Sequence, residues 1–174
     1  VSVCCNVLGF MPWFFVKLED ADEYDAVADA ITRLNARRFE DSKLELSLEL
    51  SKFADAYHPP GTVFPFIRVC CGTLDASRGL ANMIRKGLFV GRERVAFTPH
   101  ETKVDPSVRL CHARGISPTG WIEVRGATMS HTKTRAQLEV FCFDRGVFPA
   151  PVSRSRLTEA SFDLEGYASE KGFP

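Results

Sequence analysis

Two carboxylates near the end of the chain have the types and spacing of a site for divalent cations. Asp163 and Glu165 lie two residues apart within residues 161–165 (SFDLE), where apolar and acidic side chains alternate as in a strand. Side chains i and i+2 of a strand project from the same face, so the two acids would point together. Such a pair of oxygen ligands suits Mg²⁺ or Mn²⁺, and paired ions can clamp the attacking and leaving oxygens of a phosphodiester. The alternative is two solvated acids on an edge strand.

Basic side chains are the second group of candidate functional residues. Four of them could contact backbone phosphates, or could form a solvated polar face: Arg92, Arg94, Lys133 and Arg135. The chain has 22 Lys plus Arg and 22 Asp plus Glu, so its net charge is zero. That balance argues against a surface that is a nucleic-acid footprint as a whole, but it allows local basic patches. The four histidines show no metal-ligand spacing. The six cysteines form no C-x-x-C pair, which favours structural thiols in a reducing, intracellular compartment.

The elements that must position these residues alternate between strands and helices. Apolar periodicity and turn residues predict strands at residues 1–7, 13–18, 44–50, 63–71, 94–98, 121–124, 138–143 and 159–165. Helices are predicted at residues 20–38 and 73–86, and from Asp105 as N-cap to Gly115. Leucines alternate with polar residues throughout residues 44–50, which predicts a strand with one buried face. Pro65 should lie at an edge or a bulge, and Pro149 and Pro151 indicate a linker.

The order of elements over residues 13–98 predicts an α+β fold. Strand, helix, strand, strand, helix, strand is the ferredoxin-like split βαβ pattern, an antiparallel sheet covered by two helices. This fold hosts many functions, so it does not decide between them. The phenylalanines of residues 64–69 are expected in the core, because these residues lack the exposed-aromatic motif of an RNA-recognition sheet. No apolar run reaches the roughly 18–20 residues that span a bilayer, so no membrane partner is expected.

Four segments of the chain resemble family B DNA polymerases, in family order and at family-like spacing. Residues 9–17 (GFMPWFFVK) are similar to the opening of the family's N-terminal domain, and residues 105–122 (DPSVRLCHARGISPTGWI) resemble a later stretch of it. Residues 133–140 (KTRAQLEV) match a strand of the type TRCDIEV, and residues 157–174 resemble the start of the exonuclease domain. Together these segments span nearly the whole chain. The Ile-Ser-Pro-x-Gly-Trp motif at residues 116–121 most resembles polymerases of large DNA viruses and of the delta-type branch.

The resemblance implies a domain organisation and a metal site. Residues 1–152 would be the polymerase N-terminal domain, ferredoxin-like with additional strands. Residues 153–174 would be the first strand of a ribonuclease H-like 3′–5′ exonuclease domain. Asp163 and Glu165 fall on the two metal-binding acids of the family's first exonuclease motif. Gly166 departs from the usual Cys or Thr, which changes packing but not ligation.

The resemblance also implies an activity for a longer parent protein. That parent would be a replicative, DNA-directed polymerase with template-primer DNA and dNTPs as partners and Mg²⁺ or Mn²⁺ as cofactor, acting in a host nucleus or at a viral replication site. A sliding clamp is a further candidate partner. Val1 replaces an initiator Met and Pro174 closely follows a strand pattern, so we expect a fragment that is inactive alone. The alternatives are a self-standing ferredoxin-like nucleic-acid-binding module and a structural or interaction domain.

Overall fold

Residues 13–100 form a four-stranded antiparallel sheet with helices packed on one face. The computed structural model describes residues 2–40, 42–52, 61–117, 120–129 and 134–151. The elements of this first unit are β2 (Trp13–Lys17), a 3₁₀ turn (Ala21–Glu23), α1 (Tyr24–Arg38), β3 (Leu44–Lys52), β4 (Val63–Cys71), α2 (Leu74–Lys86), β5 (Leu88–Val90), β6 (Glu93–Val95) and β7 (Pro99–His100). The strand order is β3-β4-β2-β7, and every neighbouring pair is antiparallel.

The core of this unit lies between the sheet and the two helices. Alternation along β2 turns Phe14 and Val16 toward the helices, and Leu18 follows them just beyond the strand. Ile67 and Val69 of β4 face the same way. The helices contribute their apolar stripes, which are Val27, Ala30 and Ile31 of α1 and Ala76, Leu80, Ala81 and Ile84 of α2. Sheet and helices therefore bury one continuous cluster, as the α+β prediction required.

The predicted helix ends are confirmed by their capping contacts. The Thr73 hydroxyl accepts a hydrogen bond from the Ala76 backbone N–H at 3.1 Å, and α2 ends at Gly87, whose φ of 115° is accessible to glycine. Asp105 caps α3 (Pro106–Ala113) by accepting from the Ser107 N–H at 2.8 Å. In the first helix, the Glu23 carboxylate reaches back to the Glu19 N–H at 3.1 Å. Its first turn is 3₁₀, so the α-helix begins at Tyr24.

The strand predicted at residues 94–98 is confirmed only at Arg94 and Val95, and it does not join the four-stranded sheet. Leu88–Val90 and Glu93–Val95 instead pair with each other as a hairpin, β5–β6, through a turn at Gly91 and Arg92 in which Gly91 has a φ of 63°. The strand that completes the sheet is the two-residue β7, which pairs with β2. A Gly-x turn directly after the short apolar run of residues 88–90 is an ordinary hairpin signal, and the sequence prediction did not use it.

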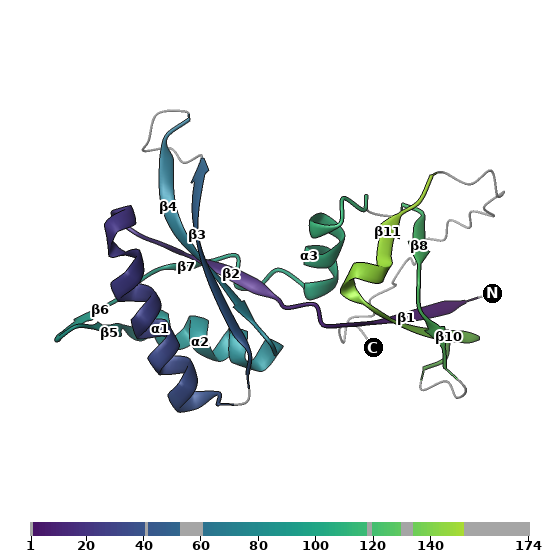
Figure 1. The fold of residues 1–174 in the computed structure, drawn as a ribbon, viewed down its shortest axis with the longest axis horizontal. Helices are drawn as coiled ribbons and strands as arrows, with labels where there is room; N and C mark the ends of the chain where they lie inside the picture. The colour runs from purple at the N-terminus through teal and green to yellow at the C-terminus, as the bar shows by residue number, and fades with distance from the viewer. Residues whose placement is uncertain (1, 41, 53–60, 118–119, 130–133, 152–174) are drawn as a thin grey trace, which may run out of the picture.

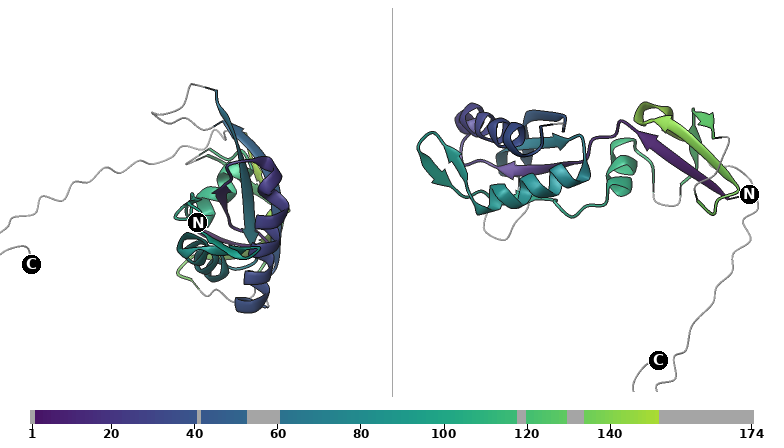
Figure 2. Two further views of the ribbon diagram at one scale, coloured as in Figure 1. Left: turned by 90° about the vertical axis from the view of Figure 1, so that its left-hand side faces the viewer. Right: turned by 90° about the horizontal axis from the view of Figure 1, so that it is seen from below.

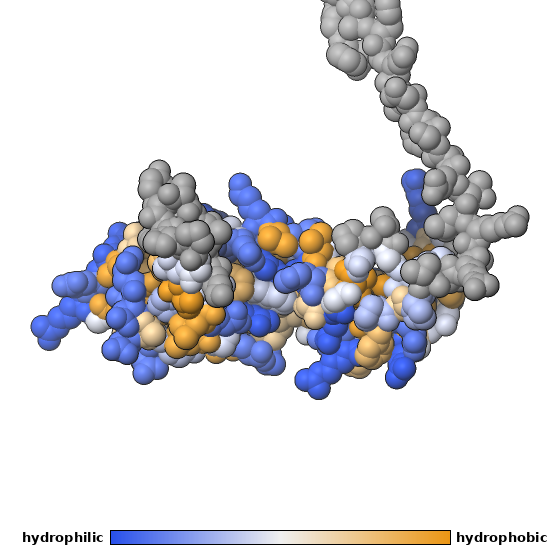
Figure 3. All heavy atoms as spheres, turned by 90° about the horizontal axis from the view of Figure 1, so that it is seen from above, coloured by the Kyte–Doolittle hydropathy of each residue, from blue (hydrophilic) through white to orange (hydrophobic). Residues whose placement is uncertain are grey.

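The hairpin of β3 and β4 extends beyond the helices, which limits how much of it is buried (Figure 1). Leu44 and Leu46 pack against the core, but Leu48 and Leu50 are 41% and 68% exposed, so the predicted buried face holds only for the first half of β3. Viewed toward the tip of this hairpin, apolar atoms form a group among polar ones (Figure 3). Pro65 lies inside β4, where its carbonyl accepts from the Leu18 N–H just past the end of β2. The missing N–H of Pro65 points to the same side, where the regular pairing of β4 with β2 has ended at Phe66.

A second group of elements joins the beginning of the chain to its later part. Its elements are β1 (Val3–Leu8), α3, β8 (Ile122–Val124), β9 (Ala127–Thr128), β10 (Leu138–Phe143), a 3₁₀ turn (Asp144–Gly146) and β11 (Val147–Pro149). β1 runs parallel to β10, β10 is antiparallel to β9, and β11 is antiparallel to β8. Pro149, expected in a linker, instead ends β11, where a strand end tolerates proline. A small core forms around Ile116, Cys142 and Val147.

The chain crosses between the two groups of elements at two places. Figure 2 shows β1 continuing into β2, and the segment after β7 leading to α3. Among the helices described, none is long and apolar enough to cross a membrane. The final predicted strand, at residues 159–165, lies outside the described residues.

Candidate functional site

The predicted metal-binding acids lie in a part of the chain that the structure does not describe. Asp163, Glu165 and the rest of residues 152–174 fall outside the described ranges. Within those ranges, no three His, Cys, Asp or Glu side chains are close enough together to hold a metal ion. The Mg²⁺ or Mn²⁺ site therefore stays a prediction from the sequence.

The predicted phosphate contacts do not share one surface. Arg92 and Arg94 belong to the β5–β6 hairpin, whereas Arg135 is exposed just before β10. Figures 1 and 2 show that hairpin and β10 at opposite ends of the molecule. Lys133 lies outside the described residues. Arg92 and Arg94 therefore lie far from Arg135, and a phosphate contact by any of the four stays a prediction.

Arg94 has a structural contact of its own. Its guanidinium donates a hydrogen bond to the Lys86 carbonyl at 2.8 Å, in the last turn of α2. A Cβ added at Gly87 would lie 2.9 Å from Nε of Arg94, so the side chain crosses closely over this glycine. A cation at this position satisfies a helix-terminal carbonyl and complements the helix dipole.

Two of the segments that carry the family resemblance pack against each other through Trp13 and Arg109. The Arg109 guanidinium lies 4.8 Å from the centre of the Trp13 ring, and that of Arg68 lies 4.2 Å from it. Both distances are within the range of cation–π attraction. Residues 9–17 and 105–122, distant in sequence, therefore meet at one tryptophan ring.

Arg109 is the most deeply buried charged residue of that contact, and Glu101 is its partner. The Arg109 side chain is only 6% exposed. Its guanidinium donates to the Glu101 carboxylate at 2.5 Å and to the Glu101 carbonyl at 3.0 Å. Glu101 has a φ of 58°, the left-handed region that non-glycine residues rarely adopt. The two hydrogen bonds hold this turn, and neither residue was singled out as a site from the sequence.

The third segment of the resemblance, residues 133–140, leads into β10 with a buried carboxylate. Glu139 is 1% exposed, and its side chain accepts a hydrogen bond from the Thr134 N–H. The bond closes the turn before the strand. Because a buried acid is costly unless it is hydrogen-bonded, Glu139 fixes how this segment enters β10.

The sheet face opposite the helices carries aromatic side chains. Phe66 is 4% exposed, as expected for a core residue, but it lies on this face rather than under the helices. Its ring meets those of Phe15 and His100 edge-on, with centroids 6.2 and 5.8 Å apart. Burial lowers the pKa of His100, and the nearby Lys17 ammonium lowers it further. A small cavity of about 180 Å³ lies beside these rings.

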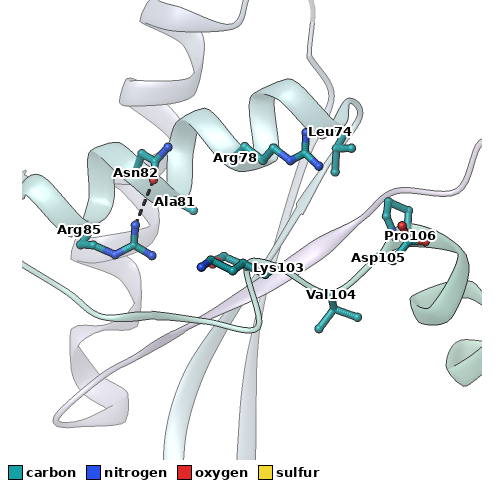
Figure 4. Close-up of a pocket in the computed structure, with 10 residues that line it drawn as sticks. Leu74, Arg78, Ala81, Asn82, Arg85, Lys103, Val104, Asp105 and Pro106 are labelled. Atoms are coloured by element: carbon teal, nitrogen blue, oxygen red, sulfur yellow. Dashed lines mark hydrogen bonds between the residues drawn. The ribbon is translucent and has the colours of Figure 1, made fainter. Parts of the chain in front are cut away.

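A cleft of about 390 Å³ lies between α2 and the segment before α3 (Figure 4). Arg78 and Arg85 of α2 reach it from one side and Lys103 from the other. Asp105 also lines it, and hydrogen bonds from Ser107, with a smaller contribution from the Arg78 charge, lower the pKa of that carboxyl. Arg85 donates to the Asn82 side chain at 3.0 Å. The cleft is basic but mixed in sign, and the sequence interpretation did not single it out.

Known proteins similar to this chain are DNA polymerases. No protein-family model matches the chain. The DNA polymerase of Pyramimonas orientalis virus is 24% identical over 183 residues, covering 99% of this chain and 15% of that protein. The DNA polymerase delta catalytic subunit of Mesocricetus auratus is 26% identical over 196 residues, covering 99% of the chain and 17% of that protein. The DNA polymerase of Paramecium bursaria Chlorella virus NY2A is 31% identical over 77 residues, 43% of the chain and 8% of that protein.

The chain thus spans 15–17% of the length of the first two of these relatives. The viral and delta-type branches are the two that the sequence resemblance named. Over 99% of its length the chain is similar to the DNA polymerase of one virus and to the catalytic subunit of one mammalian DNA polymerase delta.

Proposed function

We propose that this chain is the N-terminal part of a replicative, DNA-directed DNA polymerase of family B that also carries a 3′–5′ proofreading exonuclease. The observation that carries the proposal is the similarity to polymerases along 99% of the chain. The contact between Trp13 and Arg109 supports it, because two segments of the family resemblance meet there in space. The strand order β3-β4-β2-β7, with both helices on one face, supports the ferredoxin-like assignment for residues 13–100.

In this proposal, residues 153–174 begin a ribonuclease H-like exonuclease domain. Asp163 and Glu165 supply carboxylate oxygens, the donors that Mg²⁺ and Mn²⁺ prefer. The ions would stabilise charge at the phosphodiester during excision. Template-primer DNA and dNTPs are the partners of the whole enzyme, with a sliding clamp as a further candidate. The site of action is a reducing intracellular compartment, the host nucleus or a viral replication site.

The first experiment is to read the gene on both sides of the codons for this chain. We expect an open frame that continues into further exonuclease carboxylates and a polymerase palm with paired aspartates. The protein from that frame should extend a primer and excise a mismatched 3′ end in Mg²⁺. Asp163→Ala should abolish excision and spare extension. A start and a stop codon that bracket these 174 residues would contradict the proposal.

The 174-residue chain by itself should neither extend a primer nor hydrolyse DNA. Two carboxylates are only part of a metal site, and the described residues contain no cluster that could complete it. Metal-dependent hydrolysis by the purified chain that disappears in Asp163→Ala would refute this statement. Hydrolysis that survives the substitution would indicate a contaminating nuclease.

A further inference from the structure

A second basic groove, distinct from the cleft of Figure 4, lies where the helices of the first unit end. It is a cavity of about 510 Å³ between the C-terminal half of α1, the end of α2 and the β5–β6 hairpin, which lie side by side in Figure 1. We call it the arginine groove. Its cationic residues are Arg33, Arg37 and Arg38 of α1, Lys86 of α2 and Arg94 of β6.

The arginine groove concentrates positive charge in a chain whose net charge is zero. Five cationic side chains line it and no acidic one does. In the described part of the chain, none of the five takes part in an ion pair. Asp29, one turn before Arg33 on α1, is not part of the lining. The groove is thus more uniform in sign than the cleft that contains Asp105.

Helix dipoles explain only a small part of this charge. Basic residues commonly occupy the last turn of a helix, because each helix C-terminus carries about half a negative charge. Both α1 and α2 end beside the groove, so together they offset about one of the five positive charges. Arg94 satisfies the Lys86 carbonyl, which is the role that the dipole predicts. The arginines of α1 make no such contact among the described residues, which leaves them available to an anion.

An aromatic side chain lies in the same groove. Phe89 on β5 is 65% exposed, although Leu88 beside it is 3% exposed and packs in the core. Ala30, Leu34 and Met83 are further apolar residues of the lining. An exposed ring beside several arginines suits a single-stranded nucleic acid, whose bases stack on aromatic faces while its phosphates meet the cations. In a duplex the bases are already stacked on one another, so the ring would gain little.

We propose that the arginine groove binds a single nucleic-acid strand, with its phosphates on Arg33, Arg37 and Arg38 and one base on Phe89. The inference rests on the proposed function, since a polymerase works beside single-stranded template. Of the residues that line the arginine groove, only Arg94 was predicted from the sequence to contact phosphate. A single nucleic-acid strand fits the groove because it combines regularly spaced negative charges with flat apolar bases.

Fluorescence anisotropy of a labelled oligo(dT) mixed with the 174-residue chain, over a series of salt concentrations, tests the inference. Each phosphate contact on a single strand contributes about −0.7 to the slope of log K against log salt. Arg33→Gln with Arg37→Gln should therefore lower the magnitude of the slope by about 1.4. Phe89→Ala should weaken binding by about fivefold or more at every salt concentration and leave the slope unchanged.

The matched control removes two arginines from the cleft of Figure 4 instead. Arg78→Gln with Arg85→Gln changes the net charge equally, and it should leave the slope as in the unaltered chain. Equal effects of both double variants would show a diffuse electrostatic attraction and overturn the proposal. So would unaltered binding by the groove variant, or a groove that binds an acidic peptide but not the oligonucleotide. All four arginines are exposed, so their replacement should not change the urea unfolding midpoint. An unchanged midpoint would show that a loss of binding is not caused by misfolding.

Failure of this inference can be told apart from failure of the proposed function. If the gene continues into a polymerase frame but the groove variants bind as the unaltered chain does, only the groove assignment fails. If the frame does not continue, the anisotropy result still reports on the groove.

Discussion

Replacing Arg109 by alanine should destabilise the protein far more than replacing an ordinary surface arginine. The guanidinium of Arg109 makes two hydrogen bonds to Glu101 and lies over Trp13, while its side chain is 6% exposed. The bond to the carboxylate is discounted to about 1 kcal/mol because Glu101 is 52% exposed. The carbonyl bond contributes about 1 kcal/mol, and the ring contact about 0.5–1 kcal/mol. Loss of the packed aliphatic stem adds about 1 kcal/mol. The expected total is about 3–4 kcal/mol.

Urea unfolding monitored by tryptophan fluorescence measures this loss. Arg109→Met separates these contributions, since methionine keeps most of the stem packing and loses the guanidinium; it should cost about 2.5–3 kcal/mol. Arg125→Ala is the control, because Arg125 also pairs with a carboxylate, at 2.9 Å, but both side chains are more than half exposed. That pair should contribute less than about 0.5 kcal/mol.

Removal of the Glu101 side chain should cost less stability than removal of the Arg109 side chain. Glu101→Ala removes only the carboxylate bond, because the carbonyl of residue 101 still accepts from Arg109. It should therefore cost less than Arg109→Ala by about 2.5–3 kcal/mol. An Arg109→Met protein as stable as the unaltered one, or Arg109→Ala and Arg125→Ala losses that are equal, would refute the argument.

Three other predictions concern the second group of elements and the thiols. Gly126→Ala should cost at least about 2 kcal/mol, because a Cβ there would lie 2.2 Å from the Phe141 carbonyl oxygen; Thr128→Ala on β9 is the control in the same urea assay. Glu139→Ala should cost about 2 kcal/mol by leaving the Thr134 N–H without its carboxylate, whereas Glu123→Ala, exposed on β8, should change the unfolding midpoint little. Burial raises the pKa of the Cys71 thiol from 9.0 to about 12 and that of Cys5 to about 11. Raised folded-state pKa values stabilise the fold below pH 9, so unfolding midpoints should fall as the pH rises through 11 and 12, and less steeply in Cys71→Ala.

Local patterns in the sequence predicted most of the elements. The Asp105 N-cap and the alternation along β3 led to a helix and a strand close to those observed. These signals succeed because they depend on neighbouring residues alone. The strand predicted at residues 94–98 was assigned to the sheet, although its hairpin partner lay directly before it in the sequence. The exposure of Leu50 depends on where the helices end, which no local pattern contains.

Candidate site residues were harder to predict, because their role depends on distant partners. Arg94 was predicted to contact phosphate, which stays a prediction, and its hydrogen bond to the end of α2 could not be seen in the sequence. Arg109 lies in a helix whose boundaries were predicted correctly, yet its burial results from Trp13 and Glu101 in other segments. The arginines of α1 were not predicted as a site from the sequence, since the position of Phe89 beside them follows from the hairpin that was missed.

The parallel pairing of β1 with β10 has a consequence for folding during synthesis. Val3 aligns with Leu138, so the first strand pairs with one that follows about 135 residues later. At typical ribosomal rates of about 5–20 residues per second, β1 must wait on the order of ten seconds for its partner. All the strands of the sheet of residues 13–100 have been synthesised long before then. We therefore expect the middle of the chain to fold first on the ribosome, with an unpaired N-terminal strand that is a target for chaperones until the later strand emerges.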